Sequence, residues 1–186
     1  MASVLKVDKL DPQSGTALEI GTSGNTITIP SGATIVNSGT ATGFGGDNTP
    51  AFAVYSVAAQ SIATATYTKV VLDSEFYDTD SAFASDKFTV PVGGAGKYFF
   101  SYKSAIPGID DEEEFAVLLY KNGSTDDHAK AQFYSPTTDK PVWANATYAF
   151  SLAEADYIEM FVYHSEGGSQ NLRIENTYFS GFKLIE

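Results

Sequence analysis

From residue 49 to its end, the chain is a succession of short segments that alternate like β-strands and are separated by turn sequences such as VGGAG, KNGS and SEGGSQ. No window has a convincing helical period, and the nearest, SLAEADY, is too short for a helix. Many short strands at this spacing indicate an all-β sandwich or jelly roll. Strands are expected over residues 51–58, 66–73, 86–92, 96–106, 114–124, 129–136, 142–153, 156–165 and 171–186.

The aromatic residues divide the chain into two regions. Residues 1–48 contain a single aromatic residue, Phe44, and residues 49–186 contain all the others. The boundary falls in the sequence GFGGDNTP, whose glycines and proline are typical of a flexible joint. We therefore expect an N-terminal stalk or attachment segment over residues 1–48 and a head domain over residues 49–186.

Apolar residues recur in the N-terminal region with a step of nine. Leu18, Ile27 and Val36 follow this step, Ile20 and Ile29 repeat it, and the turn formers GTSGN and PSGA lie between them. This pattern predicts a β-helical or prism-like stalk. A solitary β-helix needs at least about three repeats to bury a core, so we expect three chains to wind around one axis. The alternative is a disordered linker with chance alternation.

Large aromatic residues occur on both faces of two expected strands. In YIEMFVY, Ile158, Met160 and Val162 share one face, and Tyr157, Phe161 and Tyr163 share the other. In KYFFSYK, the aromatic residues at 98, 100 and 102 share one face and Phe99 lies on the other. A sandwich exposed to water would place polar residues on its outer faces, so the pattern favours burial of some outer faces by a partner subunit. The alternative is that the tyrosines are simply half-exposed.

Six motifs are spread over residues 49–186. They are AFAV at residue 51, KVVLDSEFYDTDSAF at 69, FTVPVGGAGKYFFSY at 88, LLYKNG at 118, SLAEADYIEMFVY at 151 and YFSGFKLIE at 178. Together they resemble the motifs of the C1q-like head domain. Ala155 departs from the family, which usually has glycine before this aspartate. The resemblance implies a ten-stranded jelly roll, shared with the tumour necrosis factor superfamily, and a homotrimer. The core and the trimer contacts are then expected to include Phe88, Tyr98, Phe100, Phe161, Tyr163, Tyr178 and Phe182.

The N-terminal phrases TITIPSGATI and NSGTATGFG resemble the short β-prism stretches of bacteriophage fibre proteins. This resemblance implies a virion component: a tail fibre, head fibre, spike or capsid decoration protein. Its N-terminal segment would bind other virion proteins, and its head would bind a host-surface receptor or glycan. The alternatives are a non-viral C1q-like carbohydrate- or protein-binding module and, third, a polysaccharide depolymerase.

The charge of the chain restricts its partners. Lys and Arg number 11 against 23 Asp and Glu, a formal net charge of −12, which would repel nucleic acid and anionic membrane surfaces. No apolar run approaches a membrane span, and MASVLKVDKL lacks the apolar region of a signal peptide. We expect synthesis in a host cytoplasm without export, no membrane insertion, and the virion as the final location.

The densest acidic run, DDEEE, is the candidate cation site. Carboxylates of a loop suit Ca²⁺, so Asp110, Asp111, Glu112 and Glu113 are predicted calcium ligands, and no other cofactor is expected. The alternative is a solvated loop, because blocks of like charge are usually exposed. The segment DTDSAFASD has a similar spacing of aspartates but lacks the glycine and terminal glutamate of a calcium loop.

Three side chains are candidates for receptor binding. Trp143, the sole tryptophan, can stack on a sugar face, and His128 and His164 are the only histidines. Trp143 can equally pack beneath a loop. No nucleophile elbow and no zinc-protease motif is present, so the sequence predicts a protein without enzymatic activity.

Overall fold

A computed structural model describes residues 10, 17–18, 20–38 and 48–185. The chain divides into two compact units, residues 1–42 and residues 43–186. This division falls six residues before the boundary predicted between residues 48 and 49, and each unit is considered by itself below.

The described N-terminal residues contain two tight turns and no strand. The first turn closes with the Asn25 amide donating to the Thr22 carbonyl at 2.9 Å, and the second with Ala33 donating to Pro30 at 3.1 Å. Gly24 and Gly32 occupy equivalent positions with φ of 89° and 84°, a left-handed conformation that favours glycine at this place in a type II turn. The two turns lie eight residues apart, and the step of nine between the apolar residues stays a prediction.

The apolar side chains among the described residues of this unit are not buried in a core of their own chain. Exposed fractions are 48% for Leu18, 61% for Ile20, 60% for Ile27, 45% for Ile29 and 82% for Val36. Burial in a stalk would require other chains to cover these side chains. The three-chain stalk stays a prediction.

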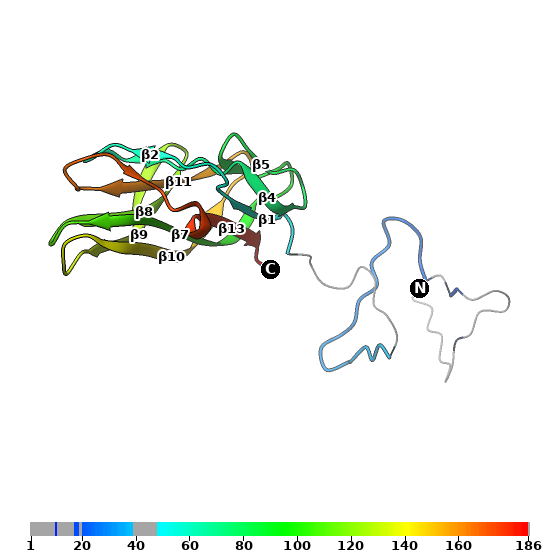
Figure 1. The fold of residues 1–186 in the computed structure, drawn as a ribbon. Helices are drawn as coiled ribbons and strands as arrows, with labels where there is room; N and C mark the ends of the chain where they lie inside the picture. The colour runs from blue at the N-terminus through cyan, green and yellow to red at the C-terminus, as the bar shows by residue number, and fades with distance from the viewer. Residues whose placement is uncertain (1–9, 11–16, 19, 39–47, 186) are drawn as a thin grey trace. The chain divides into compact units, whose positions relative to one another are not determined.

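The head consists of two antiparallel sheets packed face to face (Figure 1). The five-stranded sheet has the order β10-β7-β13-β1-β4, and the six-stranded sheet has the order β5-β6-β11-β8-β9 with β3 also paired to β11. A ribbon of β2 and β12 lies beside them. The strands are β1 (Ala51–Tyr55), β2 (Ser61–Ile62), β3 (Thr68–Lys69), β4 (Ser74–Asp78), β5 (Phe83–Ala84), β6 (Lys87–Thr89), β7 (Gly96–Ile109), β8 (Glu114–Lys121), β9 (Ser124–Tyr134), β10 (Lys140–Leu152), β11 (Tyr157–His164), β12 (Gln170–Asn171) and β13 (Tyr178–Lys183).

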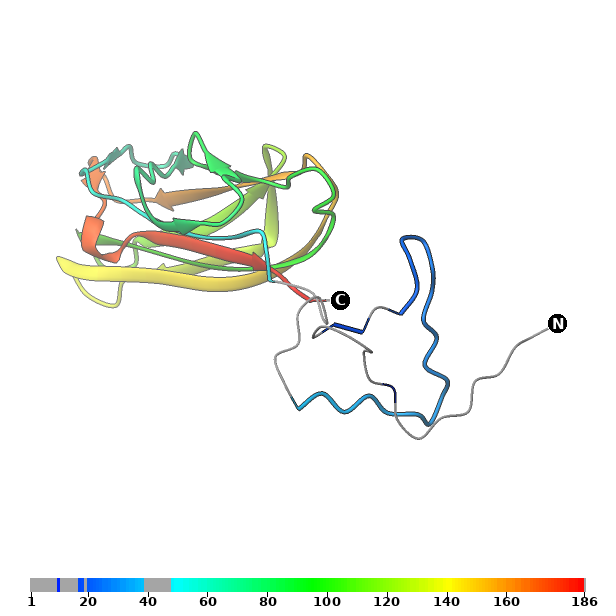
Figure 2. The same cartoon turned by 90° about the vertical axis from the view of Figure 1, so that its right-hand side faces the viewer.

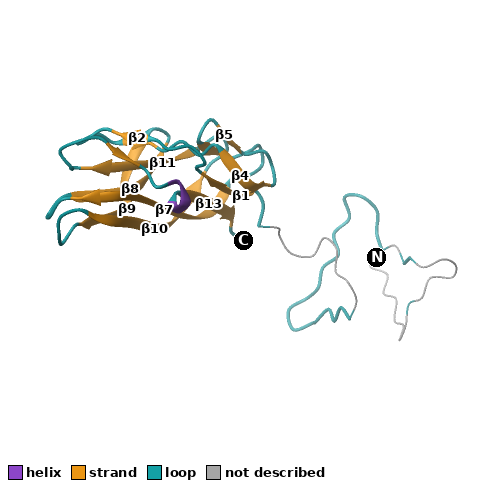
Figure 3. Ribbon diagram, in the orientation of Figure 1, coloured by secondary structure: helices purple, strands orange, loops and turns teal. Residues whose placement is uncertain are grey.

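A single 3₁₀ turn, η1 (Ile174–Asn176), interrupts the strands of the described head (Figure 3). It precedes β13, so the expected closing strand over 171–186 is in fact β12, η1 and β13. The view in Figure 2 shows the two sheets as layers, with β10 and β13 in the same layer. The predicted all-β sandwich is confirmed, and short two-residue strands raise the strand number above ten.

The core lies between the sheets and is rich in aromatic rings. Phe88, Tyr98 and Phe100, three of the residues predicted in the core or trimer interface, are completely buried in it. The ring of Phe52 stacks on Phe88 at 5.0 Å and meets the ring of Phe179 edge-on at 4.9 Å. Alternating burial along β1, β7 and β11 produces this core, because successive side chains of a strand point to opposite faces.

Two local features fit the sequence closely. Asn122 and Gly123 form the β8–β9 turn with φ of 52° and 76°, as a two-residue hairpin of type I′ requires. Gly181 faces Phe100 on one side and Phe52 on the other. A Cβ atom at Gly181 would lie 2.4 Å from Phe100 Cδ1, so the close approach of these strands depends on glycine.

Within the described residues, no helix is long and apolar enough to cross a membrane.

Candidate functional site

Three loops gather at the end of the head that is remote from Pro50. Lys183 donates to the Pro50 carbonyl and Leu184 to the Lys97 carbonyl, so the start of β7 lies near Pro50 and its last residue, Ile109, lies at the other end. The loops there, residues 110–113, 135–139 and 165–169, are called the distal loops below. Figure 1 shows this end opposite the label of the C-terminus.

Backbone hydrogen bonds join the first two distal loops. The Glu112 amide donates to the Ser135 carbonyl at 2.8 Å, and the Ser135 amide donates to the Glu113 carbonyl at 2.9 Å. The Asp139 amide donates to the carbonyl of Ile109 at 3.1 Å. These bonds make the two loops one connected surface.

Side chains of the third loop complete the connection. Glu166 Oε2 accepts from the Asp110 amide at 2.7 Å. Ser165 Oγ accepts from the Glu114 amide at 2.8 Å and donates to the Glu113 carboxylate. Because carboxylates here accept bonds from fixed donors, the loops are held in one arrangement.

The distal loops are strongly acidic. Asp110, Asp111, Glu112 and Asp139 are exposed, and Glu113 is half-buried. Among the described residues, no group of three or more acidic or histidine side chains lies close enough together to hold a metal ion. Glu113 is already used by Ser165. Calcium binding at residues 110–113 stays a prediction, and within one chain the geometry favours the alternative of a solvated loop.

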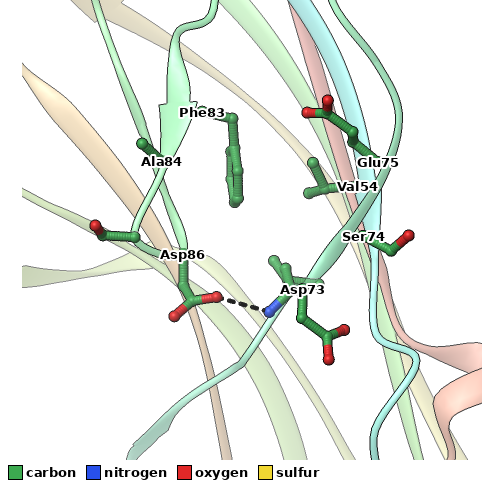
Figure 4. Close-up of a pocket in the computed structure, with 9 residues that line it drawn as sticks. Val54, Asp73, Ser74, Glu75, Phe83, Ala84 and Asp86 are labelled. Carbon is green, nitrogen blue, oxygen red and sulfur yellow. Dashed lines mark hydrogen bonds between the residues drawn. The ribbon is translucent and has the colours of Figure 1, made fainter.

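The end of the second acidic segment, residues 83–86, lines a hollow of about 510 Å³ beside β4 and β5, shown in Figure 4. Asp86 Oδ1 accepts from the Leu72 amide at 2.8 Å, and Asp73 Oδ1 accepts from the Val57 amide at 2.8 Å. The two carboxylate oxygens of Asp78 accept from the amides of Ala82 and Phe83. All three aspartates therefore accept backbone hydrogen bonds in this part of the head.

The three candidate receptor residues do not come together. His164 is completely buried, and its Nε2 lies 3.0 Å from the Ile62 carbonyl oxygen. The prediction that His164 contacts a receptor is therefore wrong, and Ser165 beside it bonds Glu113 instead of the imidazole. His128 is exposed on β9 with Nδ1 3.0 Å from Asp126 Oδ1.

Trp143 lies on β10 and is 46% exposed. Its neighbours Val142 and Ala144 belong to the core, so the indole points away from the core, on the outer face of the five-stranded sheet. It does not pack beneath a loop in the core, and it remains available to a receptor or a second chain.

The aromatic residues predicted at a trimer contact lie on opposite faces of the head. Phe161 and Tyr163 belong to the outer face of the six-stranded sheet, where they pack on their own chain. Phe161 stacks on Tyr120 at 3.8 Å, and Tyr163 contacts Tyr67 at 4.9 Å. Burial, followed by the charge of nearby Tyr67, raises the pKa of Tyr120. This cluster explains the large aromatics of β11 without a partner.

An ion pair borders this aromatic cluster. Lys130 Nζ lies 2.9 Å from Glu114 Oε1, and both side chains are largely buried. Burial by itself lowers the pKa of Lys130, but the hydrogen bond and charge of Glu114 outweigh it, so the net pKa is raised. Lys130 therefore stays charged beside Tyr67 of the aromatic cluster.

Tyr178 and Phe182 lie on the outer face of the five-stranded sheet. Phe182 packs on Phe99 at 5.6 Å between ring centroids, and Tyr178 is opposite Tyr55 in the β1–β13 ladder. Phe76 extends the row by stacking on Tyr55 at 4.5 Å. The sequence analysis did not single out Tyr55 or Phe76. The alternation of AFAVY does place Tyr55 on the face of its strand that points away from the core residues Phe52 and Val54.

No protein-family model matches the chain, and no curated protein matches it. Among solved structures, the globular domain of zebrafish complement 1qA protein is similar with a TM-score of 0.56 and 16% identity, over 73% of this chain and 97% of that chain. Murine APRIL at pH 5.0 is similar with a TM-score of 0.53 and 15% identity, over 72% of this chain and 98% of that chain. The head is a C1q/TNF-like jelly roll. At these identities the likeness establishes the fold alone.

Proposed function

We propose that the chain is a homotrimeric structural protein of a bacteriophage virion, a fibre, spike or decoration protein, whose jelly-roll head binds a host-surface receptor or glycan. The observation that carries the trimer is the outer face of the five-stranded sheet. Four large aromatic side chains, Phe76, Tyr77, Trp143 and Tyr178, are 73%, 50%, 46% and 38% exposed there. Exposed aromatic surface of this kind marks protein contacts.

The size of this face supports burial by further copies of the chain. At about 200 Å² per aromatic side chain, the exposed fractions of these four residues amount to about 400 Å². A standard interface buries about 800 Å² on each partner, so four side chains would supply about half of it. The C1q-like resemblance of the sequence points to the same assembly.

The N-terminal unit supports attachment to the particle. Its described apolar side chains are exposed in the single chain, and its two Ser-Gly turns lie eight residues apart. A segment of this kind is suited to assembly with other copies or with another virion protein. Labelling the purified particle with an antibody against the head tests the virion role, and absence of the protein from particles would contradict it.

We place receptor binding at the distal loops. They are exposed and acidic, their backbone is held by hydrogen bonds, and loops on a rigid scaffold are the usual location of recognition. An acidic surface favours a partner with cationic groups or a glycan rich in hydroxyl donors. No enzymatic step is proposed.

Competition with phage adsorption tests this surface. Full-length protein should bind host cells and reduce adsorption of the phage, and Asp111→Asn should weaken that binding. Asp127→Asn is the matched control, because Asp127 is exposed on β9 near the opposite end of the head. Equal binding by the two variants and the parent would argue against the distal loops. Binding to a cellular partner with no protein on particles would favour the non-viral binding module.

A further inference from the structure

A hollow of about 390 Å³ lies on the outer face of the five-stranded sheet. Its walls are mostly apolar and include Tyr55, Val57, Phe76, Ile174 and Tyr178. The Phe76 ring stacks on Tyr55, yet Phe76 remains 73% exposed. A phenyl ring this exposed, at the edge of a formed hollow, lacks a covering group in the single chain.

A bulge in β4 creates this arrangement. The β1–β4 register shifts between Ala53 and Val54, where Tyr77 pairs with Ala53 and Glu75 pairs with Val54. Phe76 is the extra residue, so it and Tyr77 both reach the outer face. Of these two adjacent aromatic residues, Phe76 lines the hollow and Tyr77 does not.

Trp143 lies at the same level of the sheet as this hollow but at the opposite edge. It pairs with Ala105 of β7. The Ala105 carbonyl accepts a hydrogen bond from the amide of Arg173, and Arg173 precedes Ile174 of the hollow wall. β10, which carries Trp143, and β4, which carries Phe76, are the two edge strands of the five-stranded sheet. Four strand spacings separate them, about 19 Å, so the two side chains cannot meet within one chain.

A closed ring of three chains would bring these two edges together. In a cyclic assembly each subunit presents one edge to one neighbour and its other edge to the next, which is a heterologous contact. Rotation about an axis along the strands keeps every residue at its own level. In a ring with this sheet facing the axis, Trp143 of one chain would therefore lie at the same height as the hollow of the next chain.

We infer that Trp143 of each chain inserts into the hollow beside Phe76 of the next chain in the trimer. This inference rests on the trimer of the proposed function and specifies the partner group of the hollow. The indole covers the exposed faces of Phe76 and Tyr178. A buried indole N–H needs a hydrogen-bond acceptor. The carboxylate of Glu175, which also lines the hollow, can accept this hydrogen bond.

The single tryptophan makes the contact directly measurable, because all indole fluorescence of the chain comes from Trp143. Full-length protein at a concentration that maintains the trimer should emit at short wavelength and resist quenching by acrylamide. Phe76→Ser should shift the emission to longer wavelength and increase quenching several-fold. Phe133→Ser changes an exposed phenylalanine on β9 of the six-stranded sheet; it is the matched control and should leave the emission unchanged.

Cross-linking gives an answer if Phe76→Ser does not assemble. The chain has no cysteine, so the double variant Trp143→Cys with Phe76→Cys carries the only thiols. A short bis-maleimide should join its chains into covalent dimers and trimers. Trp143→Cys combined with Val92→Cys should not be joined, since Val92 is exposed in the turn before β7, at the Pro50 end.

Failure of the contact and failure of the trimer give different results. A trimeric mass with Trp143 emission unaffected by Phe76→Ser, or with no cross-linked product, would overturn the contact and leave the trimer standing. A monomeric mass at all concentrations would overturn the trimer and the contact together.

Discussion

Gly181 gives the sharpest test of how the head packs. In Gly181→Ala the new Cβ would lie 2.4 Å and 2.7 Å from two ring atoms of Phe100 and 2.9 Å from Phe52 Cε1. Both rings are completely buried among other rings, so neither can move away at low cost. Overpacking of this kind costs about 1–3 kcal/mol.

The size of the expected effect can be measured by thermal unfolding. At about 4 °C per kcal/mol for a domain of this length, Gly181→Ala should lower the melting midpoint by about 4–12 °C. Gly168→Ala is the matched control, because nothing lies within 4 Å of its Cβ position and its φ is not positive. The control should change stability by less than about 1 kcal/mol, toward stabilisation. Equal midpoints for the two variants, at equal protein concentration, would refute the proposed packing of β13 between β1 and β7.

Three further changes test separate parts of the account. Tyr102→Phe removes the buried hydroxyl that donates to the Ala129 carbonyl at 2.7 Å and should cost about 1 kcal/mol in chemical denaturation, whereas no loss would contradict the bond. The hydrogen bond from Asn122, followed by that from Lys121, lowers the pKa of Asp156 from 3.8 to about 2. The ionised Asp156 therefore stabilises the fold above pH 3.8, and this stabilisation is lost as the pH falls toward 2. In Asp156→Asn, the stability–pH curve should lack this loss. Calcium chloride should raise the melting midpoint if residues 110–113 bind Ca²⁺, and titration calorimetry with no heat of binding would rule against that site.

The fold of the head was predictable because its strands carry strong local signals. Alternation along KYFFSYK correctly placed Tyr98 and Phe100 in the core and Phe99 on the other face. The turn sequence KNGS correctly marked the connection of β8 and β9, where Asn122 and Gly123 both adopt the positive φ that few other pairs tolerate. These signals depend on neighbouring residues alone, so a sequence reveals them directly.

Contacts between distant segments were not predictable in the same way. The aromatic residues of β11 indicated a partner subunit, but Tyr67, about a hundred residues earlier, packs on Tyr163 within the same chain. His164 was a candidate for recognition, yet the β2 segment covers it and supplies the Ile62 carbonyl. The hollow beside Phe76 depends on a bulge, which alternation cannot reveal.

The candidate site was only partly predictable. The structure brings the loops of residues 110–113, 135–139 and 165–169 together at the distal end, whereas the segment with His128 follows a turn at the opposite end. The order of strands in the two sheets decides which loops are neighbours, and that order arises from pairing between remote segments.

The mass of the full-length chain in solution tests the central claim, assembly of three heads through the outer face of the five-stranded sheet. Sedimentation equilibrium should give about 60 kDa, three times the chain mass of 19.9 kDa. A mass near 19.9 kDa across the accessible concentration range would contradict the trimer and would leave the exposed aromatics of that face without the partner we propose.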